Sequence, residues 1–218
     1  MVRVKICGIT SAADAQAAVE AGANLLGFNF YLKSPRHIEE KKAAEIRGKL
    51  PKRVKAVGIF VNRLPAEVIA LRSSLELDAV QLHGDEPPET VAEIAPVVPV
   101  IKAFRVEPEF PLTTLDEYCQ AFAFLFDAAH TDQYGGTGCT TDWDVARRAS
   151  AKHRIILAGG LKVENVAAAV RIVRPYGIDV ASGVESSPGK KDRGLLREFI
   201  QEVRRAERKS VFPEESFW

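Results

Sequence analysis

The chain opens on Val2-Arg3-Val4-Lys5-Ile6-Cys7-Gly8-Ile9-Thr10-Ser11, and this stretch predicts an α/β fold. A short run of β-forming residues ends at Cys7, Gly8 permits a tight turn, and Ser11 is a good helix N-cap. Proteins of this class place reactive groups where a strand ends and a helix follows. Residues 122–126 form another apolar run, which ends at Asp127. Cys7 and Asp127 are therefore the first candidates for functional side chains.

The same alternation of strand and helix continues along the whole chain. Short β-rich runs predict strands at 2–7, 24–30, 54–61, 79–83, 98–104, 122–127, 154–158 and 178–181. Helical patterns predict helices at 11–21, 38–47, from Pro65, after Pro87-Pro88, in a short stretch ending near Cys119, from Trp143, at 163–174 and at 195–208. The polar, glycine-rich segment 128–141 fits no regular element, which is typical of a functional lid or of disorder.

Eight such units predict the fold class. Alternating strands and helices imply a parallel sheet. Eight units in 218 residues favour a single (β/α)8 TIM barrel, a fold of roughly 200–250 residues. We expect one barrel domain over 1–210 and a short C-terminal tail, 211–218, that is not a separate domain. The alternative is an open doubly wound sheet, which would need a G-x-G-x-x-G turn that Cys7-Gly8-Ile9-Thr10-Ser11 does not provide.

Composition excludes several classes of protein. The 30 basic and 29 acidic residues give a net charge of +1, which argues against a nucleic-acid or membrane-surface partner. The apolar runs are too short for a transmembrane helix, and the N-terminus lacks the apolar region of a signal peptide. Three cysteines and four histidines show neither disulfide nor metal-ligand spacing. We expect a cytoplasmic protein that needs no metal.

The residues at the predicted strand ends would meet at one face of a barrel. They are Cys7, Asn29, Asn62, His83, Arg105, Asp127, Gly159-Gly160 and Ser182-Gly183. A lone cysteine is often a small buried hydrophobe, but a thiol beside a tight turn at a strand end would face the barrel mouth. Lys5 lies on the same face one layer deeper, at a depth similar to Asp179 on the last strand. We therefore predict a buried ion pair between Lys5 and Asp179.

Asp127 suits general acid catalysis. The apolar run before it would hold the carboxyl at the edge of a dry core, where desolvation raises a carboxyl pKa. The alternative is a capping or turn aspartate, but no helix is predicted to begin at that point. Cys7 and Asp127 lie on well-separated strands and would approach a ligand from different sides. This arrangement favours proton transfer by a general base and a general acid over metal binding.

The glycine-containing ends of the last two strands predict a phosphate site. Barrels often bind phosphate with the loops after these strands, where Gly160, Ser182 and Gly183 would offer backbone N–H groups and a hydroxyl. Glycines after strands are also common turn formers, so each pair alone is a weak signal. Arg36 follows a proline-fixed turn and is either a solvated arginine or a bidentate carboxylate ligand. The roles of Gln81, His83 and Asp85 stay open.

Ordered sequence blocks along nearly the whole chain resemble the phosphoribosylanthranilate isomerase family of tryptophan biosynthesis. The blocks are Lys5-Ile6-Cys7-Gly8-Ile9-Thr10, Gly27-Phe28-Asn29-Phe30-Tyr31, Ser34-Pro35-Arg36, Val57-Gly58-Ile59-Phe60-Val61-Asn62, Gln81-Leu82-His83-Gly84-Asp85-Glu86, Gly135-Gly136-Thr137-Gly138, Leu157-Ala158-Gly159-Gly160-Leu161, Glu164-Asn165-Val166, Asp179-Val180-Ala181-Ser182-Gly183-Val184-Glu185, Pro188-Gly189 and Lys191-Asp192. Thr141 and Val163 depart from the family pattern, where phenylalanine and proline are usual.

The resemblance implies a barrel isomerase without a cofactor. It would convert N-(5-phosphoribosyl)anthranilate into 1-(2-carboxyphenylamino)-1-deoxyribulose 5-phosphate by an Amadori rearrangement. In that reaction Asp127 would be the general acid that opens the ribose ring, and Cys7 the general base that removes the C2′ proton. Arg36 would bind the anthranilate carboxylate, and the backbone around Gly160, Ser182 and Gly183 the phosphate. The oligomeric state would be a monomer or a homodimer.

Two other functions fit a barrel that binds a phosphorylated molecule. The related isomerase of the histidine pathway uses paired aspartates, so a cysteine at position 7 argues against that reaction. A non-catalytic metabolite-binding barrel would be expected to lack one of the two reactive groups, yet Cys7 and Asp127 are both present. Cys119, Cys139 and the tail ending in Phe217-Trp218 have no predicted role.

Overall fold

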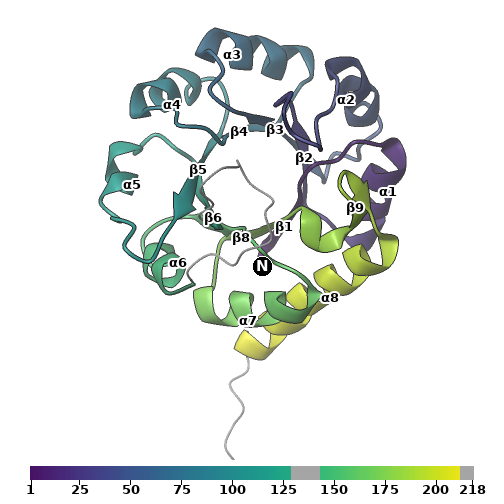
Figure 1. The fold of residues 1–218 in the computed structure, drawn as a ribbon, viewed down its shortest axis with the longest axis vertical. Coiled ribbons are helices and arrows are strands. Elements are labelled where there is room, and N and C mark those ends of the chain that lie inside the picture. The colour runs from purple at the N-terminus through teal and green to yellow at the C-terminus, as the bar shows by residue number, and fades with distance from the viewer. Residues whose placement is uncertain (129–142, 212–218) are drawn as a thin grey trace, which may run out of the picture.

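The strands of the computed structural model form a ring, with the helices arranged outside it (Figure 1). The structure describes residues 1–128 and 143–211. Within these ranges eight strands form a closed barrel in the order β1 to β8, and every neighbouring pair is parallel. The pairing of the first strand with the last confirms the (β/α)8 barrel and excludes the open doubly wound sheet.

The observed elements follow the predicted alternation. The barrel strands are β1 (Arg3–Ile6), β2 (Leu25–Asn29), β3 (Lys55–Phe60), β4 (Ala79–Leu82), β5 (Val100–Val106), β6 (Ala123–Ala128), β7 (Ile155–Leu157) and β8 (Gly177–Val180). The helices are α1 (Ala12–Ala21), α2 (Glu40–Arg47), α3 (Pro65–Ser74), α4 (Pro88–Ile94), α5 (Thr114–Glu117), α6 (Trp143–Ser150), α7 (Val163–Val173) and α8 (Arg193–Val211). None of the helices in the described ranges is both long and apolar enough to cross a membrane.

The prediction missed the structure between β8 and α8. A 3-10 turn, η1 (Ser182–Val184), is followed by a hairpin of β9 (Glu185–Ser187) and β10 (Lys190–Lys191). These strands are too short to produce an alternating pattern that a sequence reading could detect. The last helix also begins two residues earlier and ends three residues later than predicted.

Helix α1, which follows the turn after β1, begins at the predicted N-cap, Ser11. The Ser11 hydroxyl accepts a hydrogen bond from the Asp14 amide at 3.1 Å and so caps α1. Gly22 ends the helix in a left-handed conformation with φ 102°. Gly8 also has a positive φ, +73°, which a residue with a side chain rarely adopts. This turn fixes where Cys7, the residue before it, faces.

The barrel interior is filled by small and branched apolar side chains. Successive strand residues point alternately into the barrel and toward the helices. The inward cluster comprises Val57, Ala79, Ile101, Ala103, Ala123, Leu125, Ile156 and Ala158. A larger core between the sheet and the helices contains Phe28, Phe60 and Phe126. The alternation therefore directs residues near the strand ends, such as His83 and Asp127, toward the mouth of the barrel.

A buried ion pair joins the two strands that close the barrel. Lys5 on β1 and Asp179 on β8 are direct register partners, and Lys5 Nζ lies 3.0 Å from Asp179 Oδ1. The two side chains are 1% and 8% exposed, which confirms the predicted buried ion pair. Burial disfavours the lysine charge, but Asp179 and then Cys7 outweigh this effect, so the pKa of Lys5 is raised. Lys5 therefore stays charged inside the barrel.

We expect Lys5→Met to lower the free energy of unfolding by about 3–5 kcal/mol, because Asp179 would be left buried without its partner. Lys55→Met is the matched control: Lys55 Nζ is 2.9 Å from Asp78 Oδ1, but its side chain is 55% exposed. Loss of an exposed pair should cost at most about 1 kcal/mol. Urea unfolding of both variants measures the difference, and equal losses would contradict the role given to the Lys5–Asp179 pair.

Candidate active site

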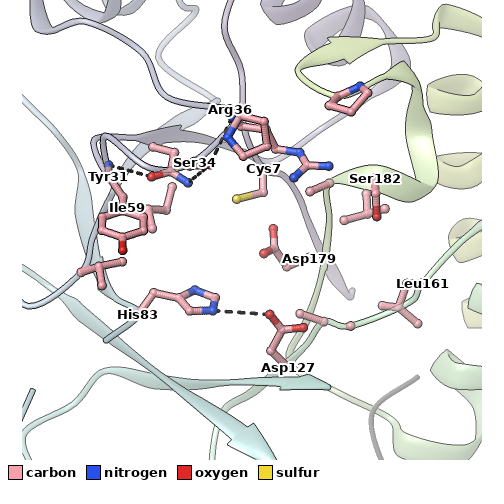
Figure 2. A pocket seen from close by; sticks show the side chains of 18 of the residues that line it. Cys7, Tyr31, Ser34, Arg36, Ile59, His83, Asp127, Leu161, Asp179 and Ser182 are labelled. Atoms are coloured by element: carbon pink, nitrogen blue, oxygen red, sulfur yellow. Dashed lines mark hydrogen bonds and ion pairs between the residues drawn. The ribbon is translucent and has the colours of Figure 1, made fainter. Parts of the chain in front are cut away.

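A cavity of about 630 Å³ opens at the carboxyl ends of the barrel strands. This volume is within the range of small-molecule sites. Its lining includes Cys7, Arg36, His83, Asp127 and Ser182, which Figure 2 labels, and also Gly160; these residues come from six different strand ends and loops. The structure thus brings five of the six predicted site residues to one cavity, and the sixth, Gly183, packs directly behind it.

Cys7 sits immediately above the closing ion pair. Its backbone N–H donates to the Val180 carbonyl at 2.9 Å, so the pairing between β1 and β8 continues one residue past the end of β1. Burial raises the pKa of the Cys7 thiol, and the negative charge of Asp179 raises it further. The positive charges of Lys5 and Lys191 act in the opposite direction but do not compensate. Cys7 is therefore mainly a protonated thiol at neutral pH. Lys5 and Lys191 make its ionisation easier than burial and Asp179 alone would allow.

Asp127 faces the cavity from β6, opposite Arg105 on β5. It is 5% exposed, in agreement with the predicted dry surroundings. One of its carboxylate oxygens, Oδ2, lies 3.4 Å from Nε2 of His83. Figure 2 shows Cys7 and Asp127 on different sides of the cavity, with His83 on the side of Asp127. The structure thus has the two-sided arrangement expected from the sequence.

Arg36 is held by a carboxylate and is not a solvated surface arginine. Its Nε and Nη2 donate to the two oxygens of Glu185 at 2.9 and 2.7 Å, and the Arg36 side chain is only 12% exposed. Its aliphatic stem packs on Gly8, where a β-carbon would come within 2.5 Å of Arg36 Cδ. A residue larger than glycine at position 8 would displace the guanidinium, so the β1–α1 turn also positions Arg36.

Glu185 joins Arg36 to a second buried cation. Lys191 Nζ lies 2.7 Å from Glu185 Oε1 and also donates to the Ala181 carbonyl at 3.1 Å. Burial opposes the Glu185 charge, but hydrogen bonding by Arg36 and the charge of Lys191 outweigh it and lower the pKa of Glu185. Two cations and one ionised carboxylate leave this cluster with a net charge of +1. The cluster therefore favours an anionic ligand group.

The loops after β7 and β8 touch one another. Gly159 and Gly160 have positive φ values of 79° and 61°, and together with Ser182 they line the cavity. A β-carbon at Gly183 would come within 1.9 Å of the Leu161 carbonyl oxygen, so only glycine allows the two loops to approach this closely. A short helical turn, η1, begins at Ser182. This is the arrangement that commonly binds phosphate in barrels.

Three residues of this site, Glu185, Lys191 and His83, have no role predicted from the sequence. Glu185 binds Arg36 and Lys191 binds Glu185, yet these two residues lie 149 and 155 positions from Arg36 along the chain. The Pro188-Gly189 pair between them is a local signal that could have predicted the turn of the hairpin. His83 is one of the predicted strand-end residues, but local sequence patterns do not predict its contact with Asp127. The predicted loop 128–141, except Ala128, and the tail 212–218 lie outside the described residues, as do His130, Cys139 and Thr141.

Comparisons with known proteins agree on one family. The model of the family described as N-(5'phosphoribosyl)anthranilate (PRA) isomerase matches residues 4–202. The N-(5'-phosphoribosyl)anthranilate isomerase of Geobacter sulfurreducens is 52% identical over 204 residues, which cover 94% of this chain and 99% of that protein. The solved structure of phosphoribosyl anthranilate isomerase from Thermotoga maritima has a TM-score of 0.86 at 43% identity, covering 94% and 99% of the two chains. Another solved isomerase, in complex with reduced 1-(o-carboxyphenylamino)-1-deoxyribulose 5-phosphate, has a TM-score of 0.82 at 40% identity and the same coverage.

The charges around Cys7 predict opposite effects of two substitutions on its thiolate. Lys191→Gln removes a charge that lowers the Cys7 pKa, so the thiolate should form only at higher pH than in the unmodified protein. Asp179→Asn removes a charge that raises this pKa, so the thiolate should form at lower pH. Ultraviolet absorbance of the thiolate against pH, in a background with Cys119 and Cys139 replaced by alanine, measures both shifts. Shifts in the same direction would contradict this electrostatic account.

Proposed function

The chain belongs to the N-(5'-phosphoribosyl)anthranilate isomerase family, and we propose that Cys7 and Asp127 are its general base and general acid. The protein is an isomerase of tryptophan biosynthesis with a phosphorylated small-molecule substrate. It converts N-(5-phosphoribosyl)anthranilate into 1-(2-carboxyphenylamino)-1-deoxyribulose 5-phosphate. The observation that carries the catalytic assignment is the placement of the thiol and the carboxyl on different sides of one cavity.

Asp127 acts in the ring-opening step. Its protonated carboxyl gives the proton to the ribose ring oxygen, and the bond between that oxygen and C1′ breaks with its electron pair moving to the oxygen. The lone pair of the anthranilate nitrogen forms a C=N bond to C1′, which gives an iminium. Burial of the Asp127 side chain supports this role, because a carboxyl shielded from water can deliver its proton to the substrate alone.

Cys7 acts in the second step. Its thiolate removes the proton from C2′, the electrons of that C–H bond form the C1′=C2′ bond, and the π pair of the C=N bond returns to the nitrogen. The resulting enolamine tautomerises to the ketone. A thiol with a raised pKa is a stronger base once ionised, although a smaller fraction of it is ionised at neutral pH. The nearby charges of Lys5 and Lys191 support formation of the anion. As a base, Cys7 forms no covalent adduct with the substrate.

The two anionic groups of the substrate have separate binding groups in the cavity. The Arg36–Glu185–Lys191 cluster, with its net positive charge, suits the anthranilate carboxylate. The Gly160 backbone, the Ser182 hydroxyl and the backbone at Gly183 suit the phosphate. Anchoring both ends of the molecule fixes the ribose between Cys7 and Asp127. Because a catalytic thiol must stay reduced, we place this enzyme in the cytoplasm.

Cys7→Ser and Asp127→Asn should each reduce kcat by about 100- to 10,000-fold, the range typical of a lost general acid or base. The assay follows the disappearance of phosphoribosylanthranilate fluorescence with purified protein. Cys119→Ser is the matched control, since Cys119 is exposed and lies outside the cavity. Near-normal kcat in folded Cys7→Ser and Asp127→Asn proteins would refute the catalytic assignment.

Arg36→Ala should raise KM about 10- to 150-fold, because charge-assisted hydrogen bonds of roughly 1.5–3 kcal/mol to the substrate carboxylate are lost. We expect a smaller change in kcat, since Arg36 does not take part in proton transfer. A substrate analogue with aniline in place of anthranilate is the control: it lacks the carboxylate, so the unmodified and variant enzymes should bind it with similar affinity. An unchanged KM for the natural substrate would argue against the carboxylate site.

A further inference from the structure

A buried glutamine, Gln81, and a half-buried histidine, His83, have no part in the proton transfers described above. Gln81 lies on β4 between Ile59 of β3 and Ile101 of β5, and it is completely buried. His83 follows on the same face, with its backbone N–H bound to the Phe60 carbonyl at 2.8 Å. A buried amide is costly unless it is hydrogen-bonded. Within the described residues, Gln81 Oε1 has no hydrogen-bond partner, so packing alone does not account for a glutamine here.

The contact between Gln81 and His83 selects one form of the imidazole. Gln81 Nε2 lies 2.7 Å from His83 Nδ1. In this placement of the Gln81 amide its nitrogen, which can only donate, faces the ring; Nδ1 is then the acceptor and the ring proton is on Nε2. That nitrogen is the one 3.4 Å from Asp127 Oδ2, and Figure 2 shows it directed at this oxygen. The three side chains thus form a chain with one direction, from the amide through the imidazole to the carboxyl.

We propose that Gln81 and His83 are positioning residues for Asp127. The imidazole N–H of His83, oriented by Gln81, donates to Asp127 Oδ2, so the acidic proton of Asp127 is on Oδ1. This inference rests on the proposed role of Asp127 as general acid. With Oδ2 accepting from His83, a protonated Asp127 carries its proton on Oδ1. The proton then passes from Oδ1 to the ribose ring oxygen, while His83 keeps its own proton.

A hydrogen bond from His83 to Asp127 in the substrate-bound enzyme would strengthen as the reaction proceeds. Asp127 is neutral before it gives up its proton and anionic afterwards. A hydrogen bond to an ionised carboxylate is roughly twice as strong as one between neutral groups. The stabilisation by His83 is therefore greater after proton transfer than before, which is the condition for lowering the barrier. At 3.4 Å from Asp127 Oδ2, His83 Nε2 forms no hydrogen bond to this oxygen in the structure. The proposal therefore requires this contact to shorten when the substrate is bound, as catalytic hydrogen bonds commonly do.

The first test measures the tautomer. In nitrogen NMR spectra of the full-length protein with labelled histidine, the His83 signal is identified by its loss in His83→Leu. We expect Nε2 to carry the proton in the unmodified protein. Gln81→Leu, which keeps an apolar side chain of similar size, should remove this preference. A proton on Nδ1 in the unmodified protein, or an unchanged tautomer in Gln81→Leu, would overturn the proposal.

The second test measures kcat and KM. His83→Leu should lower kcat about 10- to 100-fold, the effect typical of residues that orient a catalytic group, with little change in KM. His83→Gln, whose side-chain amide can supply an N–H near the former Nε2, should restore part of kcat. His153→Leu is the matched control, because His153 packs edge-to-face against Phe124 and does not line the cavity. A normal kcat in His83→Leu, or no recovery in His83→Gln, would overturn the proposal.

A third comparison separates this inference from the proposed function. If His83 acts through Asp127, adding His83→Leu to Asp127→Asn should lower the remaining kcat no further. If His83→Leu lowers kcat by the same factor with Asp127 present and in the Asp127→Asn variant, His83 acts independently of Asp127. That result would overturn the inference alone. Full activity of Asp127→Asn by itself would instead overturn the proposed function. Urea unfolding midpoints of each variant establish that the compared proteins are folded.

Discussion

The buried ion pair between Lys5 and Asp179 is the interaction on which the rest of the structure depends. It lies in the seam between β1 and β8, where the two ends of the barrel sheet meet. A slip of one residue in this register would turn every inward side chain of β1 outward, and Lys5 would then be buried away from its partner. An apolar pair would penalise that slip far less than a charged pair does. The ion pair therefore fixes the register, and the register fixes where Cys7 faces the cavity.

The charged side chains at the β1–β8 seam continue into the cavity and give this side of it a net positive charge. Lys5 and Asp179 compensate each other, and Arg36, Glu185 and Lys191 add a net charge of +1 on the same side. A substrate with a carboxylate and a phosphate brings several negative charges to this surface. Cys7 lies where both sets of charges act, which explains why its pKa responds to Asp179, Lys5 and Lys191 together. Substrate binding and the acidity of the base therefore share one electrostatic environment.

The sequence predicted the features that follow from repeated strand–helix units and from the position of a residue along its own strand. The eightfold alternation revealed the barrel, and the strand ends identified Cys7, Asp127 and the glycine loops, because a closed parallel barrel brings all its strand ends together. Even the Lys5–Asp179 pair was predictable, since depth along a strand follows from counting residues. The attachment of Arg36 to Glu185 was not, because it depends on how a short hairpin packs onto a distant turn. Which ring nitrogen of His83 faces Asp127 could not be predicted either. It follows from the contact of the other ring nitrogen with the Gln81 amide, and no residue spacing in the sequence indicates that contact.

The proposed acid, Asp127, and the proposed base, Cys7, have different kinds of neighbours, and the chemistry of the two proposed roles accounts for the difference. Cys7 must gain a negative charge, so fixed cations such as Lys5 and Lys191 favour the state that it has to reach. Asp127 must hold a proton at one moment and lose it at the next. In the proposed arrangement, the Nε2–H of His83 can donate to Oδ2 whether the carboxyl is protonated or ionised, because Oδ2 is an acceptor in both states.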